Sequence, residues 1–307
     1  MKTESRLEKV LQAGHFAVTA ECGPPKGSDP TVVEKKGKLL LGCVDAVNVT
    51  DNQAATVRMA SMAACAILKN MGHEPILQMT TRDRNRIALQ SDLFGAYALG
   101  IRNVLCLTGD HQVFGNQKEA VGVFDLDSIQ LVRTVRDMRE NGTIIGGGDI
   151  ESPPKMFVGA AANPFADPAA WRVVRLAKKV HAGADFIQTQ CIYNMQRFSD
   201  FMTQARDMGL TEQVSILAGI TPLKSVGMAK YMATKVAGMD VPEDVINRMA
   251  GVPKKKQADE GIKIAVETIQ QVSEITGIAG VHVMAIEWEE HVPEILSAAG
   301  LDERPKV

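Results

Sequence analysis

Eight glycines divide the sequence into repeated steps in which a helix-like segment is followed by an apolar, strand-like run. Glycine suits the left-handed residue just past the end of a helix, so each of them is interpreted as a join from helix to strand. The joins are Gly14, Gly42, Gly72, Gly100, Gly142, Gly183, Gly209 and Gly277. Steps of about 30 residues fit βαβ units, and alternating strands and helices imply a parallel sheet. Eight such steps predict an α/β fold of the (β/α)8 barrel type.

Polar residues recur where the apolar runs end. Glu21, Thr50, Thr80 and Asn163 each come directly after such a run. The expected strands are Phe16–Ala20, Ala46–Val49, Ile76–Met79, Val104–Leu107, Met156–Ala162, Phe186–Ile187, Val214–Ala218 and Val281–Ile286. Barrel enzymes build their active sites from the loops that follow the strands. We therefore expect these polar side chains to face one mouth of the barrel.

A single barrel domain, residues 1–307, accounts for the whole chain, because 307 residues fit one barrel and leave little room for a second domain. We expect an N-terminal helix, and a short and a long helix within residues 239–276, between strands 7 and 8. The main helices are expected at 30–41, 56–71, 84–99, 128–140, 168–181, 195–208, 222–236 and 289–299. A capping side chain before a proline predicts three of their starts, at Asp29-Pro30, Asp167-Pro168 and Thr221-Pro222.

Several other classes of protein are excluded by composition and motifs. An open, doubly wound sheet lacks support, because neither G-x-G-x-x-G nor a Walker loop follows the first strand. The net charge of −2 and the absence of a basic patch argue against nucleic-acid binding. Five scattered cysteines without C-x-x-C, and histidines without H-E-x-x-H, predict no disulfide framework and no metal site. No run approaches 18 apolar residues, so we expect a cytoplasmic protein with no membrane span.

Three polar residues at strand ends are candidates for chemistry. Glu21 precedes a stiff Pro-Pro turn, and burial there would raise its pKa and make it a general acid near neutral pH. Asp110, after Gly109, would place negative charge beside a flat ligand, and the Gln190 amide offers both a donor and an acceptor to a heterocycle. Each residue, taken alone, also has an interpretation without a catalytic or binding role. Glu21 could cap a helix or form an ion pair, Asp110 could stabilise a turn, and the amide of Gln190 is by itself a weak signal.

Six short motifs in order give the sequence a resemblance to methylenetetrahydrofolate reductases over residues 10–300, in the form of the catalytic barrel alone. They are Glu21 with Pro24-Pro25, Thr50, Q-M-T-T-R-D (Gln78–Asp83), L-T-G-D (Leu107–Asp110), A-G-A-D-F-I-Q-T-Q (Ala182–Gln190) and A-G-I-T-P (Ala218–Pro222). The resemblance implies flavin-dependent reduction of 5,10-methylene-tetrahydrofolate to 5-methyl-tetrahydrofolate, with hydride transfer from the flavin.

Residue roles follow from the same resemblance. Glu21 matches the general acid that helps to open the methylene bridge, Asp110 an aspartate near the flavin and the folate, and Gln190 a folate-binding glutamine. The resemblance also implies NAD(P)H as electron donor and an oligomeric protein. The positions expected to contact the flavin are Thr50, Gln78, Thr80, Gly109, Asp110, Asn163, Lys178 and Lys179.

Departures from the family pattern leave two alternatives open. Gln78 stands where many members have a histidine, Lys178 replaces a frequent arginine, and A-A-A-N-P-F replaces a segment that often contributes a tyrosine and a histidine. FMN is therefore an alternative to FAD, and an iron–sulfur partner subunit is an alternative electron donor. The rival functions are a flavin-free, pterin-binding methyltransferase-type barrel and a non-catalytic paralogue in a larger complex.

Overall fold

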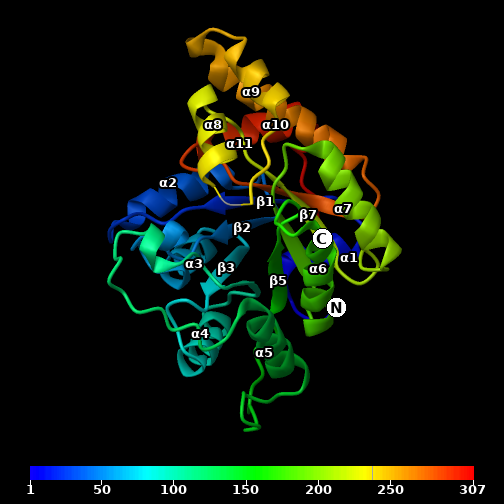
Figure 1. Ribbon diagram of the computed structural model, residues 1–307. Coiled ribbons are helices and arrows are strands. Elements are labelled where there is room, and N and C mark those ends of the chain that lie inside the picture. Colours follow the sequence, from blue (N-terminus) through cyan, green and yellow to red (C-terminus); the bar gives the residue numbers. More distant parts are fainter. Residues whose placement is uncertain (237) are drawn as a thin grey trace.

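A computed structural model describes residues 1–236 and 238–307. In this part of the chain, eight parallel strands follow one another around a closed barrel, and β8 pairs with β1 (Figure 1). The strands are β1 Ala17–Cys22, β2 Ala46–Val49, β3 Pro75–Thr80, β4 Asn103–Leu107, β5 Phe157–Ala162, β6 Phe186–Cys191, β7 Ser215–Ile220 and β8 Ile278–Val283. The predicted (β/α)8 fold is confirmed.

Helices surround the barrel and follow its strands. They are α1 Arg6–Gln12, α2 Pro30–Leu40, α3 Ser61–Asn70, α4 Arg86–Ala98, α5 Ser128–Glu140, α6 Arg172–Ala182, α7 Met195–Asp207, α8 Val226–Lys235, α9 Glu243–Ala250, α10 Gln257–Ser273 and α11 Val292–Ala298. Short 3-10 helices are η1 Gln53–Ala55, η2 Gln112–Phe114, η3 Ala169–Trp171, η4 Lys254–Lys256 and η5 Glu289–His291. The N-terminal helix and the extra helices α9 and α10 between β7 and β8 are confirmed. None of the described helices is long and apolar enough to cross a membrane.

The glycine joins adopt the backbone conformation that the sequence predicted. All eight of them have a positive φ. At Gly183 the join is also crowded, because an added Cβ atom would lie 2.3 Å from Cδ of Arg136. The chain therefore needs glycine at that position both for its backbone angle and for its packing.

Helix starts after Asp-Pro and Thr-Pro were predicted less well. Asp29 caps α2 as expected, accepting a hydrogen bond from the Thr31 N–H at 2.9 Å. The helix expected at Pro168 begins at Arg172, after a 3-10 turn, and the helix expected at Pro222 begins at Val226 with Ser225 as its cap. Tertiary packing explains the second case. An added Cβ atom on Gly261 of α10 would lie 1.7 Å from the Leu223 carbonyl oxygen, so α10 packs directly on this backbone segment.

The amino end of the barrel interior is closed by apolar side chains. Leu7 and Val10 of α1 pack there, and the rings of Phe157 and Phe186 stack with centroids 5.2 Å apart. The other buried members of this cluster are Ala17, Ala46, Ile76, Leu105 and Leu217. Because this end is filled, a ligand can enter the barrel only from the carboxyl ends of the strands.

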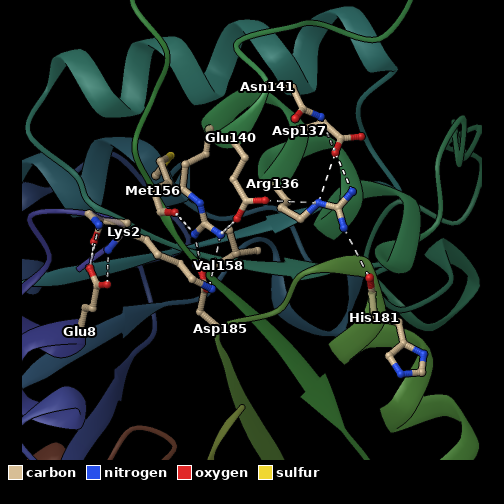
Figure 2. A network of polar contacts seen from close by, with 12 residues as sticks. Lys2, Glu8, Arg136, Asp137, Glu140, Asn141, Met156, Val158, His181 and Asp185 are labelled. Atoms are coloured by element: carbon tan, nitrogen blue, oxygen red, sulfur yellow. Dashed lines mark hydrogen bonds and ion pairs between the residues drawn. The ribbon is translucent and has the colours of Figure 1, made fainter. Parts of the chain in front are cut away.

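A buried ion pair joins Arg139 of α5 to Asp185, the residue before β6, near the closed end. Figure 2 shows Asp185 with Lys2 and Val158 beside it. Asp185 and Arg139 are each 3% exposed at the side chain. The Asp185 carboxylate also accepts hydrogen bonds from Lys2 Nζ at 2.7 Å and from the Val158 N–H at 2.9 Å. This carboxylate therefore connects the N-terminal segment, α5 and β5.

We predict that Asp185→Asn lowers the free energy of unfolding by about 3–5 kcal/mol, because the buried Arg139 would keep only Glu140, whose side chain is 46% exposed, as a charge partner. Urea unfolding followed by circular dichroism measures the change. The matched control is Asp137→Asn in α5, whose side chain is 26% exposed and pairs with Arg133 and Arg136. Loss of these exposed pairs should cost less than about 1 kcal/mol. Equal effects of the two substitutions would contradict the role of the buried pair.

Candidate active site

A cavity of about 650 Å³ opens at the carboxyl ends of the strands. Its walls combine apolar side chains from β4 and β5, polar side chains from β1, β3 and β6, and cationic side chains from α6. The residues that line it include Glu21, Gln78, Leu105, Leu107, Ala161, Ala162, Asn163, Arg172, Arg175, Lys178, Lys179, Gln188, Gln190, His282 and Met284. The cavity therefore brings together six of the residues predicted for the site, which are Glu21, Gln78, Asn163, Lys178, Lys179 and Gln190.

Glu21 is the acidic group in the interior of this cavity, whereas the other acidic lining residue, Asp167, is exposed. The pKa of its carboxyl group is raised to about 7, chiefly by burial and secondly by the negative charge of Glu289. A hydrogen bond with the Gln78 side chain and the positive charges of Lys36 and Arg58 act in the opposite direction. A carboxyl group with this pKa carries a proton in about half of the molecules at neutral pH, as a general acid requires.

The charges behind Glu21 form an ion pair that the sequence analysis did not identify. Lys36 Nζ of α2 lies 2.6 Å from Glu289 Oε1 in η5, and it also donates to the Gly23 carbonyl oxygen at 3.3 Å. The two side chains are 17% and 5% exposed. Only the closure of the barrel brings β1 beside the segment after β8, so no local sequence pattern reveals this pair.

Lys179 and its neighbours place positive charge along one side of the cavity. The Lys179 ammonium donates to the Ala161 carbonyl oxygen, and burial lowers the pKa of this lysine to about 8. Lys178 and Arg175 are more exposed and line the same side. Arg175 was missed by the sequence analysis, although its spacing of four residues from Lys179 puts both on one face of α6. This side of the cavity suits a phosphate group.

Four other predicted residues lie near the mouth but are not among the residues that line the cavity. Thr50 Oγ1 donates to Gln53 Oε1 at 2.6 Å, and Thr80 Oγ1 donates to the buried Asp51 carboxylate at 2.9 Å. Asp110 is exposed, and its carboxylate accepts a hydrogen bond from the Ala54 N–H at 3.1 Å. The fourth residue, Gly109, has a positive φ, and an added Cβ atom there would lie 3.1 Å from Cβ of Thr80.

Below Glu21, the barrel interior contains polar side chains that are hydrogen-bonded to one another. The amides of Asn48 and Gln188 bond reciprocally, at 2.6 and 3.0 Å. Thr19 Oγ1 accepts a hydrogen bond from Gln188 Nε2 at 3.2 Å and lies 2.9 Å from His282 Nδ1. These residues were not predicted from the sequence, because they lie within strands and not at the strand ends. The alternation of side chains along a strand was the available signal, because it places Thr19 and Glu21, and likewise Gln188 and Gln190, on one face.

The arrangement suits a flat, partly apolar heterocycle that carries an anionic group. Leu105, Leu107 and Ala161 provide apolar walls, the α6 cations can pair with an anion, and Glu21 can deliver a proton to a bound ligand. Among the described residues, no group of three or more histidine, cysteine, aspartate or glutamate side chains is arranged to hold a metal ion.

Comparison with known proteins agrees with this geometry. Residues 6–300 match the family model described as methylenetetrahydrofolate reductase. A probable methylenetetrahydrofolate reductase (NADPH) of Caenorhabditis elegans is 23% identical, over 96% of this chain and 44% of its own length. Methylenetetrahydrofolate reductase 2 of Schizosaccharomyces pombe is 27% identical over 73% of this chain and 35% of its own length. The Arabidopsis thaliana methylenetetrahydrofolate reductase (NADH) 1 is 24% identical over 100% of this chain and 52% of its own length.

A solved structure shares the fold over the same length. An uncharacterized protein from Clostridium thermocellum, which binds two copies of 5-methyl-5,6,7,8-tetrahydrofolic acid, superposes with a TM-score of 0.64 at 15% identity. The superposition covers 97% of this chain and 98% of that protein. The present chain spans about half or less of the length of the three curated relatives named above. Because the family model covers nearly the whole barrel, the chain belongs to the methylenetetrahydrofolate reductase family.

Proposed function

We propose that this barrel reduces 5,10-methylene-tetrahydrofolate to 5-methyl-tetrahydrofolate with a bound flavin, and that residues 1–307 form one flavin- and folate-binding domain. The observation that carries the proposal is a carboxyl group with a pKa of about 7, Glu21, in a cavity that also presents the Gln190 amide and the α6 cations. The family match and the folate-binding structural neighbour support it.

The cavity residues fit a flavin. Leu105, Leu107 and Ala161 offer apolar contact to a flat ring, while Arg175 and Lys179 can pair with a phosphate. When bound, a flavin supplies the hydride for the reduction. We expect Gln78 and Asn163 to hydrogen-bond the ring system from the cavity wall, and Thr50, Thr80, Gly109 and Asp110 to approach it from the rim.

A second cavity favours FAD over FMN. It has a volume of about 800 Å³, runs along α5 and α6, and is lined by Lys178, which also lines the main cavity. Arg86, Arg133 and His181 add positive or protonatable groups to its wall. This space adjoins the cationic side of the main cavity, where a flavin phosphate would lie, and could hold the additional nucleotide of FAD.

In the proposed reaction, Glu21 protonates the substrate nitrogen that leaves the methylene bridge. Burial keeps enough of its carboxyl group protonated at neutral pH. Gln190 is placed to bind the pterin edge, because its amide can both donate and accept hydrogen bonds. The Asp110 carboxylate, at the rim, stabilises the cationic form of the substrate.

The electron donor is either NAD(P)H or a partner iron–sulfur subunit, and we expect the working enzyme to be an oligomer. One named relative carries NADPH in its name and another NADH. An assay of methylene-tetrahydrofolate reduction with NADH, NADPH and a reduced viologen dye, run in parallel, distinguishes these donors. Activity with the dye alone would indicate a partner protein as donor, and no activity with any of them would contradict the proposed function.

We predict that protein purified from its native host is yellow and releases FAD on denaturation, identified by chromatography and mass spectrometry. Release of FMN would contradict the assignment of the second cavity to a nucleotide. Protein that takes up neither flavin would instead support the flavin-free methyltransferase-type barrel.

We predict that Glu21→Gln reduces the rate of folate reduction by about 10²–10⁴-fold, the usual contribution of a general acid. The reductant should bleach the variant's flavin absorbance at the wild-type rate, because only the folate half-reaction needs the proton. Stopped-flow absorbance measures both half-reactions. Equal damage to both would assign Glu21 a structural role, and a folate rate within about threefold of wild type would remove it from the mechanism.

We predict that folate reduction falls as the pH rises above about 7, because Glu21 then loses the proton that it must donate. Substitutions of Glu289 and Lys36 should shift the pH at which activity falls, in opposite directions. Glu289→Gln removes a negative charge and lowers the pKa of Glu21, so activity is lost at lower pH. Lys36→Met removes a positive charge and raises that pKa, so activity persists to higher pH. Shifts in the same direction would show that the two charges do not act on Glu21.

A further inference from the structure

His282 of β8 lies on the floor of the main cavity and is not used in the reaction proposed above. Its side chain is almost fully buried, and the residue lines the cavity together with Glu21 and Met284. One ring nitrogen, Nδ1, lies 2.9 Å from Thr19 Oγ1. Among the described residues, no hydrogen bond to the other ring nitrogen, Nε2, is found.

A chain of hydrogen bonds sets the direction of the contact between Thr19 and His282. In the structure the Asn48 and Gln188 amides bond reciprocally, and each oxygen accepts from the other residue's nitrogen. Gln188 Nε2 then uses its second proton to donate to Thr19 Oγ1 at 3.2 Å. The Thr19 hydroxyl therefore accepts from one side and has its own proton to donate elsewhere.

Two acceptors are within reach of that proton. His282 Nδ1 lies 2.9 Å from Thr19 Oγ1, and the Val281 carbonyl oxygen lies at 3.4 Å. The shorter contact has normal hydrogen-bond length and the longer one is at the limit, which favours donation from the hydroxyl to His282 Nδ1. Burial lowers the pKa of His282 to about 3, although a hydrogen bond with the Thr19 backbone acts in the opposite direction, so the ring is neutral and carries one proton. With Nδ1 as the acceptor, that proton is on Nε2.

We propose that His282 is a positioning residue of the site, whose Nε2–H donates a hydrogen bond to a carbonyl oxygen or ring nitrogen of the heterocycle bound in the cavity. Thr19, Gln188 and Asn48 act through it by holding the ring as this tautomer. The inference rests on the proposed function, because it requires a heterocyclic ligand in the cavity. Flavin and pterin rings share the acceptor chemistry, so the experiment tests both.

The tautomer can be measured in the wild-type protein, and one variant serves only to assign the signal. In protein labelled with ¹⁵N-histidine, two-bond proton–nitrogen spectra distinguish a protonated Nε2 from a protonated Nδ1. The chain has six histidines, and the signal of His282 is the one missing from the spectrum of His282→Gln. We expect a protonated Nε2 whose resonance shifts when FAD, FMN or 5-methyl-tetrahydrofolate is added. A proton on Nδ1, or a signal that none of the bound ligands shifts, would overturn the inference.

Ligand affinity provides the second test, with each of the three compounds titrated separately. His282→Asn keeps an acceptor for Thr19 but has no group at the place of Nε2, so the compound that His282 contacts should bind about 3–10-fold more weakly. His282→Gln can extend an amide N–H towards that place and should restore part of the affinity. His73→Gln is the control, because His73 is also buried but bonds through Nε2 to the Gly37 carbonyl oxygen outside the cavity.

The outcomes separate this inference from the proposed function. Wild-type protein that binds none of the three compounds would refute both. Wild-type protein that binds them, while His282→Asn binds each one equally well, would refute the role of His282 alone. Weaker binding of a flavin only, or of the folate only, would support the inference and identify which ring lies above His282.

Discussion

The interior of the barrel changes from apolar to polar along its axis, and the chemistry of the mouth depends on that change. Apolar side chains such as Phe157 and Phe186 fill the amino end, where β-strand backbone and ring packing leave no room for a ligand. One layer higher, the side-chain amides of Asn48 and Gln188 form two hydrogen bonds with each other. Buried polar groups are tolerated only when they are paired, so this layer is a fixed platform. Glu21 stands above it, close enough to low-dielectric protein for its pKa to rise.

The periodic parts of the fold were predictable from the sequence, because local rules govern them. All eight glycine joins have a positive φ, and Asp29 caps the helix that it was expected to cap. The starts expected at Asp167-Pro168 and Thr221-Pro222 were wrong, because a 3-10 turn comes first in one case and α10 packs on the segment in the other. Local capping signals do not contain such tertiary contacts.

The candidate site likewise contains residues that could be predicted from the sequence and residues that could not. Glu21, Gln78 and Gln190 were found because they stand at or beside the ends of apolar runs, which parallel strands bring to one mouth. The Lys36–Glu289 pair was not found, because its members come from opposite ends of the sequence and meet only when the barrel closes. The charge environment that tunes a catalytic group is thus a product of topology, whereas the identity of that group can be proposed from the position of a residue in a strand.

Both ends of the described chain lie near each other (Figure 1), and their contacts are at the closed end of the barrel. Arg6 donates to the Pro305 carbonyl oxygen at 2.8 Å, and Arg304 reaches the Phe16 carbonyl oxygen at 3.2 Å. Such a layout suits circular permutation. A short linker could join residue 1 to residue 307, and new ends could be opened in an exposed turn elsewhere, without redirecting any strand at the mouth. The barrel could equally be tethered to a surface through either end with its opening turned to the solution.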